Sequence, residues 1–77
     1  MATHYKIKNV NRIQVAERLR NARAGLGWTM QQVSDRSGVS VSAICSIEHH
    51  RRSLGLDICW RLCKALGLSM DEVLKEA

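Results

Sequence analysis

Residues 29 to 48 combine side chains that can hydrogen-bond nucleic acid with the pattern of two short helices. The second of these helices is predicted to begin after Ser40, and its small polar side chains lie on the surface that its apolar residues leave free. A helix that reads DNA enters the major groove end-on, so side chains near its N-terminus meet the edges of bases. Hydroxyl groups can form hydrogen bonds there. The chemistry that this segment suggests is recognition of DNA.

The two predicted helices must be held at a fixed angle by a tight turn. Thr29 and Gln32 have the spacing of a capping box, which predicts that the first helix begins after Thr29. Ser40 is a suitable N-cap for the second helix. Gly38 lies between them and permits the backbone angles of a tight turn. This pattern is a helix-turn-helix, although two helices of a domain that does not bind DNA can share it.

Three further helices are predicted around this pair. The first begins at Asn11 and is ended by Gly25 and Gly27, the next spans about 56–66, and the last begins at Ser69. Ser69 and Glu72 have the spacing of a capping box. Apolar residues recur at three- and four-residue spacing, as on helices with one buried face. The positions expected to face the core are Val15, Ala16, Leu19, Ala22, Val33, Ile44 and Ile47. We therefore expect a compact, all-α domain of five helices.

The length and charge of the chain limit its organisation and its partners. With 77 residues, one domain is expected, and we assign residues 1–10 to a basic N-terminal lead and 11–77 to the domain. Twelve Lys and Arg against seven Asp and Glu give a net charge of +5. Such a small basic domain suggests nucleic acid as its first candidate partner and an anionic membrane surface as its second. No apolar run approaches the length of a membrane span, so no membrane partner is expected.

The three cysteines, Cys45, Cys59 and Cys63, form no CxxC pair. We interpret them as reduced residues of a cytoplasmic protein, and Cys59 and Cys63 as packing residues. Cys45 and His49 are four residues apart and could bind zinc, but zinc needs three or four ligands, so no metal and no cofactor are expected. Cys45 also remains a candidate thiol switch at the DNA surface.

Residues 15 to 74 resemble the phage repressor/Cro-type (Xre-type) helix-turn-helix family. The segments that carry the resemblance are VAERLRNAR at 15–23, GWTMQQVS at 27–34, SGVSVSAICSIE at 37–48 and LDICWRLCKALGLSMDEVL at 56–74. The resemblance implies a lambda-repressor-like domain of five helices with its helix-turn-helix at the second and third. It also implies a homodimer that binds operator DNA and regulates transcription.

The resemblance implies three sets of site residues. The set that faces the bases is Val41, Ser42, Cys45 and Ser46. The set that contacts phosphates is Thr29, Met30, Gln31, Arg51 and Arg52. The third set is a structural pair, in which Arg23 of the first helix bridges Glu48 at the end of the third.

The chain departs from the family pattern at three places. Met30 stands where many relatives have glutamine, so its side chain is a poor phosphate ligand. His50 stands where relatives often have glycine, so we expect it to adopt the turn conformation less readily. Leu54 and Gly55 precede the fourth helix where relatives often have proline, which predicts a more mobile loop.

These observations predict a transcriptional regulator, and specifically a repressor that binds a two-fold-symmetric double-stranded DNA operator as a homodimer through its third helix. No serine–histidine–aspartate set, phosphate loop or paired acid motif is recognisable, so no enzyme is expected. Since no Arg, Gln or Asn stands on the inner part of the reading face, phosphate contacts and DNA shape should carry much of the binding. Two alternatives stay open: an antitoxin or controller of a two-gene system with a protein partner, and an adaptor that does not bind DNA.

Overall fold

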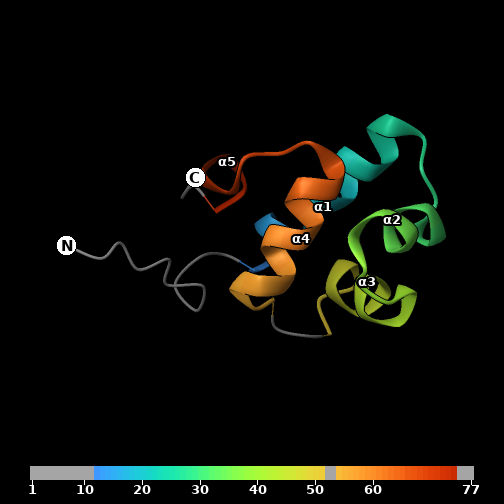
Figure 1. Cartoon of the computed structure of the whole chain (residues 1–77). Coiled ribbons are helices and arrows are strands. Elements are labelled where there is room, and N and C mark those ends of the chain that lie inside the picture. Colours follow the sequence, from blue (N-terminus) through green and yellow to red (C-terminus); the bar gives the residue numbers. More distant parts are fainter. Residues whose placement is uncertain (1–11, 52–53, 75–77) are drawn as a thin grey trace.

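The computed structural model describes residues 12–51 and 54–74, and these residues form five α-helices joined by short connections (Figure 1). The helices are α1 (Arg12–Leu26), α2 (Met30–Ser37), α3 (Val41–Glu48), α4 (Leu56–Leu66) and α5 (Met70–Leu74). The predicted five-helix, all-α architecture is confirmed. The N-terminal lead 1–10, the predicted cap Asn11, and Arg52 lie outside the described residues. No helix within the described ranges is both long enough and apolar enough to cross a bilayer.

The capping residues set the helix starts around the turn as predicted. The Thr29 hydroxyl accepts a hydrogen bond from the Gln32 N–H at 3.1 Å, and the Gln32 side chain accepts one from the Thr29 N–H at 2.8 Å. The Ser40 hydroxyl accepts from the Ala43 N–H at 3.1 Å and caps α3. Gly38 ends α2 with a φ of 77°, the left-handed conformation that glycine adopts without steric cost. Because these bonds are local, the sequence spacing was sufficient to predict them.

The predicted ends of α1 and α5 are confirmed except in two details. Gly27 follows α1 in the left-handed conformation with a φ of 70°, but Gly25 lies within the helix, which continues to Leu26. Helix α5 begins after Ser69 as predicted, but the Ser69 hydroxyl accepts from the Asp71 N–H at 3.2 Å, one residue earlier than the Glu72 N–H of a capping box. Sequence patterns resolve such shifts of one or two residues poorly at helix ends.

The core lies where α1, α2, α3 and α4 meet. Helix α2 packs against α3 and α4, while α1 packs against α3, α4 and α5. Six of the seven residues predicted to face the core are buried, and the seventh, Ala22, is half-buried against it. Helix α4 adds a row of four more buried residues. The row consists of Cys59, Leu62, Cys63 and Leu66. This packing fixes the apolar side of α3 on the scaffold.

Cys59 and Cys63 are buried packing residues, as predicted, and their sulfur atoms lie 3.9 Å apart. The hydrogen bond to Cys63, together with burial, raises the pKa of the Cys59 thiol above its ordinary value. Cys59 is also fully buried, as is usual for structural cysteines.

Helix α5 is held by a side chain from α1. The Arg18 guanidinium donates to the carbonyl oxygen of Val73 at 2.7 Å and to that of Glu72 at 3.4 Å. The five described residues of α5 are too few to form a stable helix alone. Arg18 therefore anchors α5 to α1 across 55 residues of sequence.

His50 adopts a left-handed backbone conformation after α3, with a φ of 61°. Its N–H donates to the Ile47 carbonyl at 3.1 Å, and the Arg51 N–H donates to the Ser46 carbonyl at 2.8 Å. These bonds satisfy the carbonyls at the end of α3 but require a conformation that is costly for a residue with a Cβ atom. The turn conformation expected from the family pattern is thus present at a histidine.

We expect His50→Gly to stabilise the domain by about 0.5 kcal/mol, because glycine removes the steric cost of a positive φ but adds freedom to the unfolded chain. Thermal unfolding followed by circular dichroism should show a rise of roughly 2–4 °C. The matched control is His49→Gly, where φ is −101° and the same substitution should lower the unfolding temperature. A lower unfolding temperature for His50→Gly would contradict the assignment of strain.

Candidate nucleic-acid interface

The reading surface predicted on α3 is separate from the side that packs into the core. Helix α3 buries Ala43, Ile44, Ile47 and Glu48. Ser42 is exposed, and Val41, Cys45 and Ser46 are half-buried. The four predicted base-facing residues therefore share the part of α3 that the core leaves accessible, with Val41 and Ser42 in its first turn. Their side chains are short, so only a groove that approaches α3 closely can reach them.

The start of α2 offers backbone N–H groups beside this surface. The capping box engages the N–H groups of Thr29 and Gln32, while those of Met30 and Gln31 have no partner within a helix at this position. The Met30 side chain packs against the core, so its contribution to an anion site is limited to its backbone. The N-terminus of a helix suits a phosphate through these N–H groups and the helix dipole.

An aspartate missed by sequence reasoning orients one of these residues. The Gln31 side chain donates from Nε2 to Oδ1 of Asp35 at 2.9 Å. This is an i, i+4 pair on the exposed side of α2, and the spacing of an amide and a carboxylate was the signal for it. The bond directs the Gln31 side chain toward the next turn of α2. The backbone N–H of Gln31 remains among the unpaired N–H groups at the start of the helix.

The basic loop after α3 supplies one described cation. Arg51 is exposed, and its N–H is bonded to the carbonyl of Ser46, which ties the loop to the reading helix. Arg52, its predicted companion, lies outside the described residues. The loop thus ties the backbone of an exposed arginine to the C-terminal end of α3.

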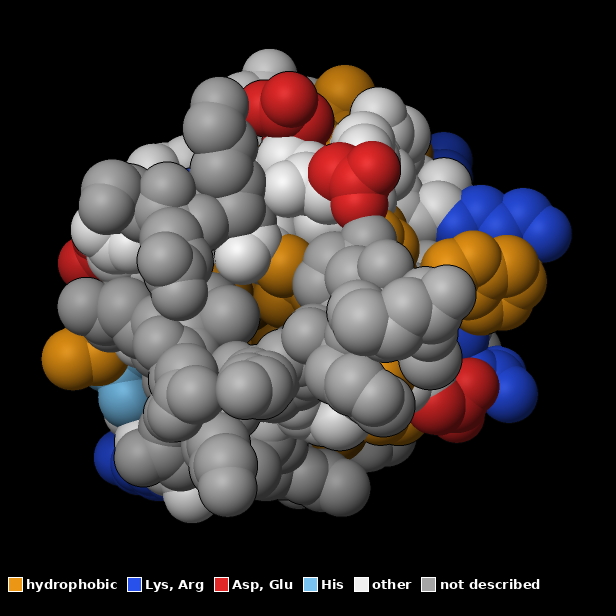
Figure 2. Space-filling model, turned by 90° about the vertical axis from the view of Figure 1, so that its left-hand side faces the viewer, with side chains coloured by type: hydrophobic (Ala, Val, Ile, Leu, Met, Phe, Trp, Pro, Cys, Tyr) orange, Lys and Arg blue, Asp and Glu red, His pale blue; other side chains and the backbone are white. Residues whose placement is uncertain are grey.

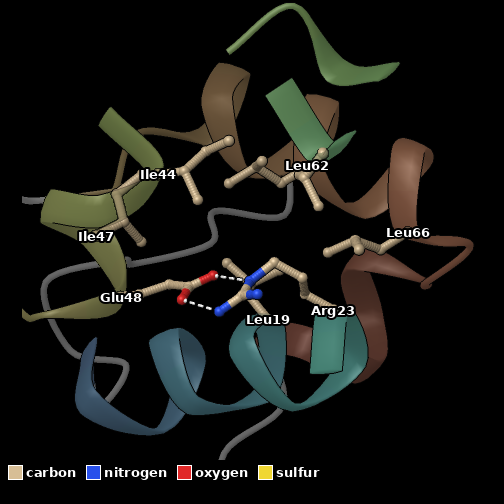
Figure 3. Close-up of a pocket in the computed structure, with 8 residues that line it drawn as sticks. Leu19, Arg23, Ile44, Ile47, Glu48, Leu62 and Leu66 are labelled. Carbon is tan, nitrogen blue, oxygen red and sulfur yellow. Dashed lines mark hydrogen bonds and ion pairs between the residues drawn. The ribbon is translucent and has the colours of Figure 1, made fainter. Parts of the chain in front are cut away.

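Arg23 and Glu48 form a two-pronged ion pair between α1 and the last residue of α3 (Figure 3). Arg23 Nε lies 2.8 Å from Glu48 Oε2, and Nη2 lies 2.8 Å from Oε1. The third nitrogen, Nη1, donates to the Trp28 carbonyl at 2.9 Å. One guanidinium therefore joins α1, the turn before α2 and the end of α3.

Burial makes this pair more than a surface contact. The Glu48 side chain is only 5% exposed and that of Arg23 is 19% exposed. The hydrogen bond to Glu48 raises the pKa of Arg23 above its ordinary value, so the guanidinium stays charged. Two parallel bonds between a guanidinium and a carboxylate fix both the distance between the two groups and their relative orientation. The geometry holds α3 at a defined angle.

The cavity behind the ion pair is almost filled. Its volume is about 10 Å³, and apolar side chains of α1, α2, α3 and α4 wall it together with Arg23 and Glu48 (Figure 3). A cavity needs roughly 10–15 Å³ to hold even one water molecule. The space is too small for an organic ligand, so Arg23 and Glu48 are positioned for support of α3.

The Cys45 and His49 side chains meet on α3. Cys45 Sγ lies 3.5 Å from His49 Nδ1, and this nitrogen lies 2.8 Å from the Cys45 carbonyl oxygen. No group of three or more potential metal-ligating His, Cys, Asp or Glu side chains occurs in 12–51 and 54–74. The geometry there is that of a histidine held by the backbone of its own helix.

Comparison with known proteins gives one family and several relatives. The model of the helix-turn-helix family HTH_3 matches residues 19–73. Transcriptional regulator ClgR of Mycobacterium tuberculosis is 35% identical over 63 residues, which cover 82% of this chain and 56% of the relative. This chain thus spans about half the length of the curated relatives it matches.

Solved structures of the same fold include two kinds of regulator. The crystal structure of the clp gene regulator ClgR from Corynebacterium glutamicum is 30% identical, with 82% of each chain covered and a TM-score of 0.75. The restriction-modification controller protein C.Esp1396I, solved as a tetramer with its 35 base-pair operator, is 20% identical. The aligned part covers 83% of this chain and 84% of the controller protein, with a TM-score of 0.76. The similarity to C.Esp1396I supports the fold.

Proposed function

Because the chain belongs to the helix-turn-helix family, we propose that it binds double-stranded DNA and regulates transcription. The observation that carries the proposal is the accessible side of α3, which the Arg23–Glu48 pair braces and the core leaves free. In this proposal α3 enters the major groove, and Val41, Ser42, Cys45 and Ser46 face the bases. The start of α2 and the loop at Arg51 and Arg52 contact the phosphates on either side.

The proposed assembly is a homodimer on a two-fold-symmetric operator, with the chain acting as a cytoplasmic repressor by binding and not by catalysis. Dimers of this kind place two reading helices in successive major grooves, about 34–36 Å apart. The fold is compatible with several copies on one DNA, since C.Esp1396I was solved as an operator-bound tetramer. Short side chains on α3 favour a mode in which backbone contacts and groove shape contribute strongly.

The direct test is a salt titration of binding to a generic duplex, with the double variant Arg51→Ala/Arg52→Ala beside the wild type. Binding should weaken steeply between about 50 and 200 mM salt, since counterions are released from each neutralised phosphate. The double variant should bind all sequences more weakly, and its slope against log salt should fall by about 1 for each lost phosphate contact. Fluorescence anisotropy of a labelled duplex measures both quantities.

The matched control is Arg20→Ala, which removes an exposed arginine of α1 outside the proposed interface. It should leave the salt slope unchanged. A wild-type chain that does not bind any duplex at low salt would overturn the proposal. A loss confined to one operator in the double variant would reassign these arginines from phosphate contact to base reading.

A further inference from the structure

A hollow of about 350 Å³ lies between the C-terminal end of α2 and the outer side of α4. Three basic side chains, an indole and two small residues line it. These residues are Arg36, Ser37, Trp60, Arg61, Lys64 and Ala65. Helix α2 has eight residues and is therefore about 12 Å long, so the hollow lies a full helix length from the proposed phosphate site at Thr29.

The charge of this hollow is strongly positive. Arg36, Arg61 and Lys64 converge on it from two helices, and Asp57 is paired with Arg61 at 3.4 Å. Both side chains of that pair are well exposed, at 47% for Arg61 and 75% for Asp57, so water screens it. Helix C-termini favour basic residues, which explains Arg36 and Lys64 but not the apolar groups beside them.

Those apolar groups are large and exposed. Trp60 is 51% exposed, and Leu56, four residues earlier on α4, is 44% exposed. Residues four apart lie on one side of a helix, so the two form a short apolar strip that leads to the hollow. Figure 2 shows basic side chains next to an exposed hydrophobic group at its right-hand edge. Tryptophan and arginine are the residue types most enriched at energetic centres of protein interfaces.

Two of the cations rest on aromatic rings. The Lys64 ammonium lies 4.9 Å from the centroid of the Trp60 ring, and the Arg36 guanidinium lies 4.2 Å from that of Trp28. Such contacts hold the cations near the surface at little cost in exposed sites. Aromatic rings thus hold Arg36 and Lys64 around the hollow, while Arg61 has the exposed Asp57 as its screened partner.

The geometry points to this surface, the hollow together with the Leu56–Trp60 strip, as a docking site for an acidic protein segment that also carries apolar side chains. Carboxylates of the segment bind Arg36, Arg61 and Lys64, and an apolar side chain packs on Trp60 beside the small residues Ser37 and Ala65. Charge complementarity selects the acidic partner, and the exposed strip selects a partner with apolar residues. A free small anion would leave Leu56 and Trp60 exposed. The inference does not depend on DNA binding.

The test is selection of random peptides displayed on phage against the full chain, followed by affinity measurements on the selected peptides. We expect a consensus of Asp or Glu beside Leu, Ile or Phe. Trp60→Ala and Lys64→Glu should each weaken these peptides at least tenfold. The matched controls are Leu26→Ala, at a 47% exposed leucine, and Arg20→Glu, at an exposed arginine, and both should change the affinity less than twofold. Circular dichroism verifies that each variant is folded.

Three results would overturn the inference. One is the absence of an acidic and apolar consensus, or a consensus whose affinity the two variants leave unchanged. Another is equal binding of acidic peptides that lack apolar residues, which makes the hollow a simple anion site. The third is a larger loss of duplex affinity in Lys64→Glu than in Arg20→Glu, which makes the surface a second DNA contact. The duplex measurement is separate, so failure here is distinguishable from failure of the proposed function.

Discussion

Arg23→Ala is expected to lower the free energy of unfolding by about 3–5 kcal/mol, because it leaves the buried Glu48 carboxylate without its partner. The guanidinium also bonds the Trp28 carbonyl, so the turn before α2 loses a donor at the same time. A domain of this size has little stability to spare. Most of the helical circular dichroism should therefore disappear at urea concentrations at which the wild type remains folded.

Two comparisons distinguish the effect of breaking the ion pair from the effect of removing an arginine side chain. Arg20→Ala removes an exposed arginine of the same helix and should cost less than about 0.5 kcal/mol. The double variant Arg23→Met/Glu48→Leu should be more stable than Arg23→Ala, since no buried charge is left unpaired. If Arg23→Ala and the wild type unfolded at the same midpoint urea concentration, the ion pair would not be stabilising the fold.

The pH dependence of this effect follows from the raised pKa of Arg23. A group whose pKa is higher in the folded state contributes stability that is complete below its unfolded pKa and is lost as the pH rises through the folded value. For an arginine both values lie above the range in which proteins are studied. The part of the stability difference that comes from Arg23 protonation should therefore stay constant between about pH 6 and pH 9.

Ser42→Glu is expected to reduce duplex affinity at least a hundredfold while the domain stays folded. The new carboxylate stands in the first turn of α3, on the accessible side that the proposed function places against DNA. Repulsion between like charges across an interface costs several kcal/mol. The same carboxylate interacts favourably with the N-terminus of its own helix, so thermal stability should not fall. Fluorescence anisotropy and circular dichroism measure the two effects.

The control for net charge is Asn21→Glu, which adds the same charge at an exposed position of α1. It should weaken binding only slightly, through the general field of the protein. Ser42→Ala, which removes a hydroxyl without adding charge, should cost less than about tenfold. Equal losses for Ser42→Glu and Asn21→Glu would place α3 away from the DNA.

Local signals in the sequence were sufficient to predict most of the fold. Thr29 and Ser40 begin α2 and α3 because their hydroxyls bond N–H groups three residues away, a distance that spacing alone reveals. Interactions between distant segments were not predictable in this way. The bond from Arg18 to α5 spans 55 residues, and the hollow combines side chains of α2 and α4.

The candidate site also contains some features that local sequence signals predict and others that they do not. The accessible side of α3 follows from the spacing of Ile44 and Ile47, because the buried residues define what remains free. The pairing of Arg23 with Glu48 came from the family resemblance, since nothing in the local pattern joins residues 25 positions apart. The contact of Gln31 with Asp35 was local and visible in the spacing, but it had no place in the family pattern.

Because α3 has a buried side and an accessible side, its accessible residues can be substituted separately from those that pack in the core. Ala43, Ile44, Ile47 and Glu48 anchor the helix, and none of them belongs to the four positions assigned to the bases. Substitutions at those four positions therefore leave the buried anchors of α3 in place. If α3 reads DNA as proposed, a library randomised at the same positions offers a route to new target sites on an unchanged scaffold.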